Sequence, residues 1–174
     1  MKIKIKGIKI FKSKMFLDNR GYFQEIYKKN KINNKELIFH CLSSSKKNVL
    51  RGLHLQTKNP QDKFLTVLKG KIFDVVVDLR KNSKTFGKIF SIVLSANSPR
   101  SLVVPRGCAH GFLGLDKENI IYYLCDNYRS ERHEIGINWC DKDLKIKWPI
   151  KKPKVSVKDK NNLSFALYKN KFLN

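Results

Sequence analysis

Short β-rich runs separated by turn signals recur along most of this chain, and this pattern constrains the fold most. Turns are indicated where Gly, Pro, Asn and Asp cluster, as at 58–60 and 105–107. The runs between the turns are rich in β-branched and aromatic residues and cover 64–68, 72–79, 88–94, 101–104 and 120–124. Strands this short, spaced roughly ten residues apart, are typical of a sandwich or barrel. We therefore predict an all-β fold.

The other segments predict smaller elements around this barrel. At 174 residues, the chain has room for one domain, 1–174, with a sizeable core. The run FDVVVDL (73–79) alternates poorly, which predicts a strand covered on both faces. Residues 29–37 predict a short helix, and 2–6 predict a strand with one wet face. The lysine-rich end, 146–174, predicts a tail that packs over the barrel.

A formal net charge of +23 raises the question of nucleic-acid binding. The lysines are spread from Lys2 to Lys171, and the chain has no arginine-rich arm, zinc-finger spacing or RRM-type aromatic motif. Scattered lysine is usually a solvated surface. A non-catalytic module that binds nucleic acid or another anionic ligand is therefore the alternative to an enzyme. The same surface would help to gather a small anionic substrate.

The sequence shows no membrane or export signal. It contains no apolar run of 18 residues, and its first residues lack the apolar region and cleavage site of a signal peptide. We expect a cytoplasmic protein that binds neither a membrane nor nucleic acid. The cysteines share no C-x-x-C spacing, which favours reduced, mostly buried thiols at Cys41, Cys108, Cys125 and Cys140.

The segment NVLRGLHLQ (48–56) carries the clearest chemical signal. Strict alternation would place Leu50, His54 and Gln56 on one face of a strand, and polar groups on an otherwise apolar strand indicate a lined cavity. An arginine lies three residues before His54, and Lys63 lies nine residues after it. A histidine that titrates near neutrality, beside fixed cations, can remove a proton while the cations hold the resulting negative charge. The segment therefore indicates an enzyme.

A set of motifs gives the chain a specific resemblance. The motifs are DNRGYFQEIY (18–27), NVLRGLHLQ (48–56), PQDK (60–63), KGKIFDVVVDLRKNSKTFGK (69–88), VPRGCAHGF (104–112), YRSERHEIGINW (128–139) and DLKIKWP (143–149). In this order and spacing, the chain resembles the dTDP-4-dehydrorhamnose 3,5-epimerases of deoxysugar biosynthesis over about residues 16–160. The resemblance implies a cupin-type jelly-roll barrel with short peripheral helices, in a homodimer. It also implies a cofactor-independent nucleotide-sugar epimerase that inverts C3, C5 or both in a dTDP-4-keto-6-deoxyhexose.

Epimerisation beside a ketone needs a base on one face of the sugar, an acid on the other and positive charge at the carbonyl oxygen. The resemblance implies that His54 is the base, Asp159 the carboxylate that holds its other ring nitrogen, and Lys63 the cation. Tyr128 is the expected acid, since a phenol keeps its proton at neutral pH and can yield it to an enolate carbon. Tyr123 would point to the opposite face of a strand and is expected to pack.

The resemblance also implies a set of substrate-binding residues. The set is Arg20, Phe23, Glu25, Arg51, Gln56, His110, Glu134 and Trp139. The first three match thymidine-binding positions, and the last two match positions near the nucleotide. Arg51 matches an arginine near the diphosphate or sugar, and a planar guanidinium suits phosphate oxygens. His110 matches a second active-site histidine. Packing alone is the alternative for His110 and Trp139.

Two further readings compete with a 3,5-epimerase. Metal-dependent cupins usually carry an H-x-H motif, whereas this chain reads His54-Leu55-Gln56, so no metal site is predicted. The run FHCL (39–42) stands where the family has glutamine and asparagine side chains that touch the substrate. This departure leaves open a 3-epimerase, a 5-epimerase or a ketoisomerase that acts on a different nucleotide-4-keto sugar.

Overall fold

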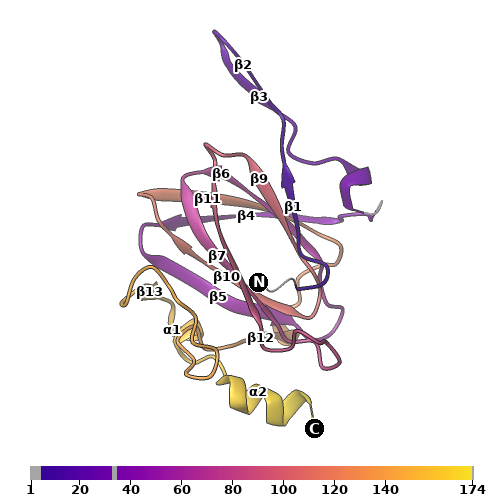
Figure 1. Ribbon diagram of the computed structural model, residues 1–174, viewed down its shortest axis with the longest axis vertical. Coiled ribbons are helices and arrows are strands. Elements are labelled where there is room, and N and C mark those ends of the chain that lie inside the picture. Colours follow the sequence, from indigo (N-terminus) through magenta and orange to yellow (C-terminus); the bar gives the residue numbers. More distant parts are fainter. Residues whose placement is uncertain (1–4, 33–34, 174) are drawn as a thin grey trace.

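The computed structural model describes residues 5–32 and 35–173, and two antiparallel sheets face each other in it (Figure 1). The first sheet has the order β1 (Lys9–Lys12), β9 (Arg100–Val104), β6 (Lys63–Lys69), β11 (Glu118–Cys125) and β4 (Phe39–Lys46). The second has the order β12 (Glu134–Gly136), β5 (Val49–Gln56), β10 (Cys108–Gly114), β7 (Lys71–Asp78) and β8 (Ile89–Ser95). The predicted all-β jelly-roll fold is therefore confirmed.

Short elements complete the fold. They are the hairpin β2 (Met15–Asp18) and β3 (Gly21–Gln24), the strand β13 (Lys154–Val155), the 3-10 turns η1 (Lys29–Ile32) and η2 (Glu131–His133), and the helices α1 (Val157–Lys160) and α2 (Phe165–Phe172). The helix predicted over 29–37 is wrong beyond η1, because residues 35–37 are not helical. Most of the strand predicted over 2–6 lies outside the described residues, and the first described strand is β1.

The main core fills the space between the two sheets. It contains Ile5, Leu65, Val67, Leu102, Val104 and Ile121 from the N-terminal segment and the first sheet, and Ile72, Val76, Leu94, Cys108 and Phe112 from the second. Alternation along each strand points every second side chain into this layer. Each side chain of this size contributes about 1.5–3 kcal/mol when it leaves water. This core holds the two sheets at a fixed separation.

A second core covers the outer face of the second sheet. Val75 and Val77 of β7 pack there with Phe165 and Tyr168 of α2, and the Tyr168 hydroxyl donates to the Leu79 carbonyl at 3.1 Å. Ser164 caps α2, because its hydroxyl accepts from the Leu167 amide at 3.1 Å. The prediction that 73–79 is covered on both faces is confirmed, because Val76 packs in the main core and Val75 and Val77 in the second.

The β2–β3 hairpin projects away from the barrel (Figure 1). Its apolar side chains are exposed, with Leu17 and Phe23 at 77% and 66% of their full accessible area. The rings of Phe16 and Phe23 lie 6.2 Å apart, so they pack mainly on each other. An isolated two-stranded hairpin has marginal stability in water. The rest of this chain does not cover these apolar side chains, so they form an exposed apolar surface.

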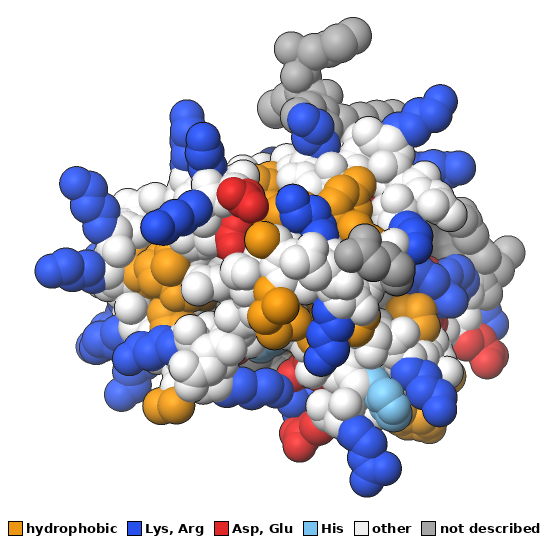
Figure 2. All heavy atoms as spheres, turned by 90° about the horizontal axis from the view of Figure 1, so that it is seen from below, with side chains coloured by type: hydrophobic (Ala, Val, Ile, Leu, Met, Phe, Trp, Pro, Cys, Tyr) orange, Lys and Arg blue, Asp and Glu red, His pale blue; other side chains and the backbone are white. Residues whose placement is uncertain are grey.

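The charged surface matches the sequence. Figure 2 shows Lys and Arg side chains scattered over one face, without a single dense patch.

Within the described residues, no helix has the length and apolar character needed to cross a membrane. The thiols of all four cysteines are free, but only Cys108 and Cys125 are buried, whereas Cys41 is half-buried and Cys140 is exposed, so the prediction of mostly buried thiols holds for two of the four. His, Cys, Asp and Glu side chains form no group of three or more that could hold a metal ion in 5–32 and 35–173.

A bulge in β5 changes which side chains share a face. β10 pairs His110 with His54 and Phe112 with Arg51, so three residue steps on β5 oppose two on β10. Gly52 lies in this bulge with a φ of +116°. Arg51 and His54 consequently line the same cavity although they are three residues apart. The strict alternation predicted from Leu50 to Gln56 is therefore wrong across Gly52.

The bulge depends on glycine at position 52. A Cβ there would lie 2.6 Å from the Gly111 Cα and 2.7 Å from the His110 carbonyl oxygen. Gly52→Ala is expected to lower the free energy of unfolding by about 1–3 kcal/mol through strain at positive φ, and by a similar amount through overpacking. Urea unfolding measures the loss. Gly21→Ala is the matched control, because Gly21 also has positive φ but nothing within 4 Å of its Cβ position. Equal losses in the two variants would contradict the role of the close approach.

Candidate active site

A cavity of about 470 Å³ opens at one end of the barrel between the two sheets. Its walls come from β4, β6 and β11 of the first sheet, from β5, β10 and β12 of the second, and from α1. The lining residues are Phe39, Cys41, Leu42, Ser43, Arg51, His54, Gln61, Lys63, His110, Gly111, Phe112, Tyr123, Cys125, Arg129, Glu134, Ser156, Lys158 and Asp159. Six of the predicted site residues are therefore brought together: Arg51, His54, Lys63, His110, Glu134 and Asp159.

His54 and Asp159 form a close pair in the cavity wall. His54 Nε2 lies 2.6 Å from Asp159 Oδ1, and the Gly52 amide donates to Asp159 Oδ2 at 3.3 Å. Asp159 lies in α1, where the Ser156 hydroxyl accepts from its amide at 3.0 Å and so fixes the start of the helix. Burial raises the pKa of Asp159, but the hydrogen bond and charge of His54, with the Gly52 amide, lower it below its ordinary value overall. Asp159 is thus an ionised acceptor for an imidazole N–H.

Lys63 begins β6 and points into the same cavity. Burial lowers the pKa of its ammonium below the ordinary 10.5, and Arg129 lowers it further, while Cys125 and Glu134 act in the opposite direction. Cys125 is its direct partner across the β6–β11 ladder. The Lys63 ammonium has lost much of its hydration in this position. It is therefore stabilised strongly when a negatively charged group enters the cavity.

A buried carboxylate holds the His110 ring in place. Its Nε2 lies 2.8 Å from Asp74 Oδ2, and Asp74 is fully buried in β7. The register of β5 and β10 sets His110 directly opposite His54. The ring of Tyr123 lies 6.2 Å from the His110 ring, and it packs against the main core but also lines the cavity, so the expectation that Tyr123 points away from the site is wrong. Burial raises the pKa of the Tyr123 phenol above its ordinary value.

A cluster of ion pairs lies beside the base. Arg129 Nε donates to Glu134 Oε2 at 3.1 Å, and Lys158 Nζ donates to Glu134 Oε1 at 2.7 Å. Although burial raises the pKa of Glu134, hydrogen bonds from Arg129 and Lys158 lower it overall to about 2. Lys158 lies in α1 next to Asp159, so these pairs also fasten α1 to β12. Arg51 of β5, in the same sheet as Glu134, is anchored to β4 by a 2.8 Å bond from its Nε to the Ser45 hydroxyl.

The depressed pKa of Glu134 predicts a pH dependence of stability. Because the folded pKa lies below the ordinary 4.5, the ion pairs add stability above pH 4.5 and lose it as the pH falls towards 2. Glu134→Gln is therefore expected to be less stable than the unmodified protein at pH 6, and the gap should narrow at pH 3. Urea unfolding at both pH values measures the gap. Glu36→Gln, which removes an exposed carboxylate, is the control and should show little change. A gap that stays constant with pH would refute the assignment.

Tyr128 lies outside the cavity lining, at its rim. Its side chain is 67% exposed, and its ring packs edge-on against Phe39, a cavity residue, with the centroids 6.2 Å apart. The phenol is thus next to the cavity without being enclosed by it.

Four other predicted residues do not line the cavity of their own chain. Arg20 and Phe23 lie on or beside the projecting hairpin, where Arg20 pairs with Asp18. Glu25 follows the hairpin and pairs with Lys28. Trp139 is absent from the described cavity lining, and its carbonyl accepts from the Trp148 indole. Their substrate-binding roles stay predictions, because local motifs do not say towards which surface a hairpin or loop points.

Gln56 also lies outside the cavity lining. Its side chain is buried, and its amide group binds the backbone of Asn59, Tyr128 and Ser130 at 2.7, 3.2 and 2.7 Å. Both donors of the amide and one acceptor site of its oxygen are therefore used within the chain, and a substrate-binding role for Gln56 stays a prediction.

Sequence reasoning missed Arg129, Lys158 and Asp74. Arg129 and Lys158 are two of 37 basic residues, and charge alone could not single them out. Their positions beside Tyr128 and Asp159 were the available signal. Asp74 had a clearer one, because an aspartate inside the apolar run FDVVVDL is expected to be buried and paired.

Fold and cavity together define a cupin-type jelly roll with an acid–base site set among cations. Comparison with known proteins agrees. Residues 2–166 match the family model described as dTDP-4-dehydrorhamnose 3,5-epimerase. The chain is 40% identical over 172 residues to the dTDP-4-dehydrorhamnose 3,5-epimerase of Shigella flexneri, with 95% of both proteins covered. The chain belongs to the dTDP-4-dehydrorhamnose 3,5-epimerase family.

Solved structures give the same result. The dTDP-6-deoxy-D-glucose-3,5-epimerase of Legionella pneumophila, in complex with dTDP-4-keto-L-rhamnose, is 34% identical and superimposes with a TM-score of 0.90, covering 95% of this chain and 91% of that one. A 3′-monoepimerase from Streptomyces bikiniensis, in complex with dTDP-quinovose, is 26% identical with a TM-score of 0.92, covering 98% and 90%. Proteins that differ in the number of centres they invert thus share this fold.

Proposed function

We propose that this protein inverts C3 and C5 of a dTDP-4-keto-6-deoxyhexose by removing and returning a proton at each carbon. The observation that carries the proposal is the His54–Asp159 pair, 2.6 Å apart, in a cavity that Lys63 also lines. The names of the relatives and the dTDP-sugar in the Legionella complex support the substrate class. No net redox change occurs, because each step only moves a proton.

His54 acts as the base. A carboxylate only accepts hydrogen bonds, so Nε2 carries the proton shared with Asp159 Oδ1, and the lone pair of Nδ1 is left to attack. Nδ1 takes the proton from the carbon beside the C4 ketone. The electron pair of the broken C–H bond forms a carbon–carbon double bond, and the carbonyl pair moves to O4. Asp159 stabilises the imidazolium that results.

Cationic side chains hold the charge that develops. Lys63 stabilises the O4 enolate, because a cation already stripped of water needs no reorganisation when that charge appears. Arg51, Arg129 and Lys158 line the cavity around it and provide a site for the diphosphate. A guanidinium matches two phosphate oxygens at once, which suits Arg51 for this contact.

Tyr128 returns a proton to the opposite face of the ring. The O4 pair reforms the ketone, the double-bond pair takes the phenolic proton, and the phenolate and the imidazolium then re-equilibrate with water. The position of Tyr128 beside Phe39 at the cavity rim supports this role. Two such cycles invert C3 and C5.

Deuterium exchange tests the proposal. In deuterated water, NMR of a dTDP-4-keto-6-deoxyhexose should show deuterium at C3 and C5 and the appearance of the epimer, both only with the protein present. Absence of exchange at both carbons would falsify the proposal. GDP- and UDP-linked sugars serve as comparison substrates.

A 3-monoepimerase is the second candidate. It is favoured by the likeness to the Streptomyces bikiniensis enzyme and by Phe39 and Cys41 in the cavity wall, where apolar and thiol groups line the space beside Lys63. The same NMR experiment separates the two functions. Deuterium at C3 alone, with inversion at C3 alone, would replace the main proposal with this one.

We also propose that the protein is a homodimer. The exposed apolar side chains of the β2–β3 hairpin indicate that another protein surface covers them. A second copy of the chain can cover them in a two-fold symmetric dimer, in which the same contact forms twice. Arg20 and Phe23 would then serve the cavity of the partner. Such an exchange of hairpins would explain why the positions matched to thymidine binding lie on a hairpin that projects away from its own barrel.

Mixing two inactive variants tests this arrangement. His54→Ala and Arg20→Ala proteins are unfolded, mixed and refolded together. If hairpins serve the partner, about one quarter of the activity should return, because half the dimers are mixed and each has one intact site. If each hairpin serves its own barrel, no activity returns. Sedimentation of the unmodified protein checks that dimers exist.

We also propose a location for the protein and a single-domain organisation. The free thiols of all four cysteines fit a reducing compartment, and we assign the protein to the cytoplasm. The continuous core shared by both sheets supports one domain over 1–174.

A further inference from the structure

Lys63 lies where three neighbouring strands of the first sheet end. It is the first residue of β6, and the two ladders pair it with Val104, the last residue of β9, and with Cys125, the last residue of β11. Strand ends open more easily than the middle of a sheet. The backbone that carries the cavity cation therefore needs support from beyond the ladders.

Within the described residues, no hydrogen bond holds the Lys63 side chain in place. The side chain is a flexible chain of four carbons, and no described residue forms a hydrogen bond or an ion pair with its ammonium. The position of the ammonium in the cavity consequently depends on the backbone to which the side chain is attached.

Two aspartates clamp this backbone. Asp62 and Asp126 lie directly beyond the pair that Lys63 forms with Cys125, and two hydrogen bonds join them. The Asp62 amide donates to Asp126 Oδ1 at 2.8 Å, and the Asp126 amide donates to the Asp62 carbonyl at 3.3 Å. The aspartates thus hold the residue before Lys63 and the residue after its ladder partner.

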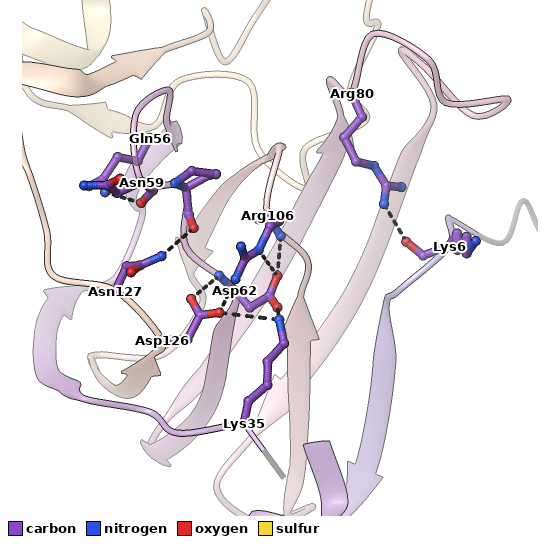
Figure 3. A network of polar contacts seen from close by, with 10 residues as sticks. Lys6, Lys35, Gln56, Asn59, Asp62, Arg80, Arg106, Asp126 and Asn127 are labelled. Atoms are coloured by element: carbon purple, nitrogen blue, oxygen red, sulfur yellow. Dashed lines mark hydrogen bonds and ion pairs between the residues drawn. The ribbon is translucent and has the colours of Figure 1, made fainter. Parts of the chain in front are cut away.

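Two cations extend this clamp to the neighbouring strands (Figure 3). Arg106, in the turn after β9, donates from its amide to Asp62 Oδ1 at 2.7 Å, and its guanidinium donates to Asp126. Lys35, in the segment before β4, forms ion pairs with both carboxylates. The side chains of Asp62 and Asp126 are only 20% and 8% accessible, so water weakens these interactions little. The cluster therefore ties the strand ends around Lys63 to one another.

We infer that Asp126, together with Asp62, is a positioning residue for Lys63. The inference rests on the proposed function, in which the Lys63 ammonium stabilises the O4 enolate. Neither aspartate is among the described residues that line the cavity, so both act through the backbone of Lys63. The enolate charge appears only in the transition state. A displaced ammonium would therefore slow the reaction without weakening substrate binding.

Initial rates of epimer formation from a dTDP-4-keto-6-deoxyhexose, over a range of concentrations, test the inference. For Asp126→Asn, we expect kcat about 10- to 100-fold lower and KM within about twofold of the unmodified protein, because an error of about 1 Å in placement can cost about 100-fold in rate. Asparagine has nearly the same size but lacks the charge that binds Lys35 and Arg106. Asp62→Asn should act in the same way, and it keeps the inference testable if Asp126→Asn does not fold.

Glu118→Gln is the matched control. Glu118 is the first residue of β11, and it pairs with Lys69, the last residue of β6. This ion pair joins the same two strands as the aspartates do, but at the end far from Lys63. The variant should leave kcat and KM unchanged. Equal losses of kcat in Glu118→Gln and Asp126→Asn would overturn the inference.

A double variant distinguishes positioning from general damage. Adding Asp126→Asn to Lys63→Met should lower kcat no further, because the ammonium that Asp126 positions is already gone. A further fall in kcat in the double variant would overturn the inference, as would a rise in KM of Asp126→Asn as large as its fall in kcat.

The same rates separate this inference from the function on which it rests. Absence of epimer formation by the unmodified protein, or full activity of Lys63→Met, would refute the proposed function or its assignment of Lys63, and the inference with it. Loss of activity in Lys63→Met, with an unchanged kcat in Asp126→Asn and in Asp62→Asn, would refute the inference alone.

Discussion

His54→Ala is expected to lower turnover by about 10²- to 10⁴-fold, the range that positioned acid–base groups contribute. The reason is that His54 pairs with a carboxylate and keeps 24% of its side chain accessible in the cavity. His110 has the same kind of partner in Asp74, but only 5% of its side chain is accessible, so it is a poor substitute. Deuterium entry at C3 and C5 and epimer formation should fall together, since both require proton removal.

His40→Ala is the control for this variant. His40 lies on the exposed face of β4, where it contacts Tyr122, and it does not line the cavity. Its loss should leave turnover unchanged. Far-ultraviolet circular dichroism should show that both variants stay folded. A His54→Ala protein that keeps its exchange rate would assign the base to another group.

Lys63→Met is expected to lower turnover by about 10²- to 10³-fold, as loss of one oxyanion-stabilising donor does elsewhere. Methionine fills nearly the same volume, so the change removes the charge with little effect on packing. Proton removal should be slowed, because the enolate forms without a cation at O4. Initial rates across a range of substrate concentrations measure the effect on kcat and kcat/KM.

The lowered pKa of Lys63 adds a pH signature. Burial favours the neutral amine, so activity should decline on the alkaline side at a pH below 10.5, as the protonated form is lost. Lys69→Met, at the exposed end of the same strand, is the control and should keep full activity. Comparable losses in both variants would show that overall charge matters and that the position in the cavity does not.

The sequence was informative about the strands because their pattern is local. Alternation and turn residues place β6, β7, β8, β9 and β11 to within a few residues. The bulge in β5 was not predicted, although glycine inside a strand is the usual signal for one. Its consequence is large, because it turns Arg51 into the same cavity as His54.

The site was predicted in part for a related reason. His54, Lys63 and Asp159 lie on elements whose packing within the chain fixes their direction, and the motifs carried that information. Phe23 lies on a hairpin that contacts little of its own barrel, so no local pattern could say where it acts. Gln56 differs from both groups: its strand was predicted, but the backbone groups that bind its amide lie in loops and cannot be predicted from a motif.

The placement of Asp159 has a consequence for biosynthesis. The chain emerges from the ribosome with its N-terminus first, so every strand from β1 to β13 emerges before Asp159 does. A nascent barrel can therefore assemble its walls while His54 still lacks the acceptor that selects its tautomer. Catalytic competence would be acquired last, when α1 docks onto β5 and completes the maturing enzyme.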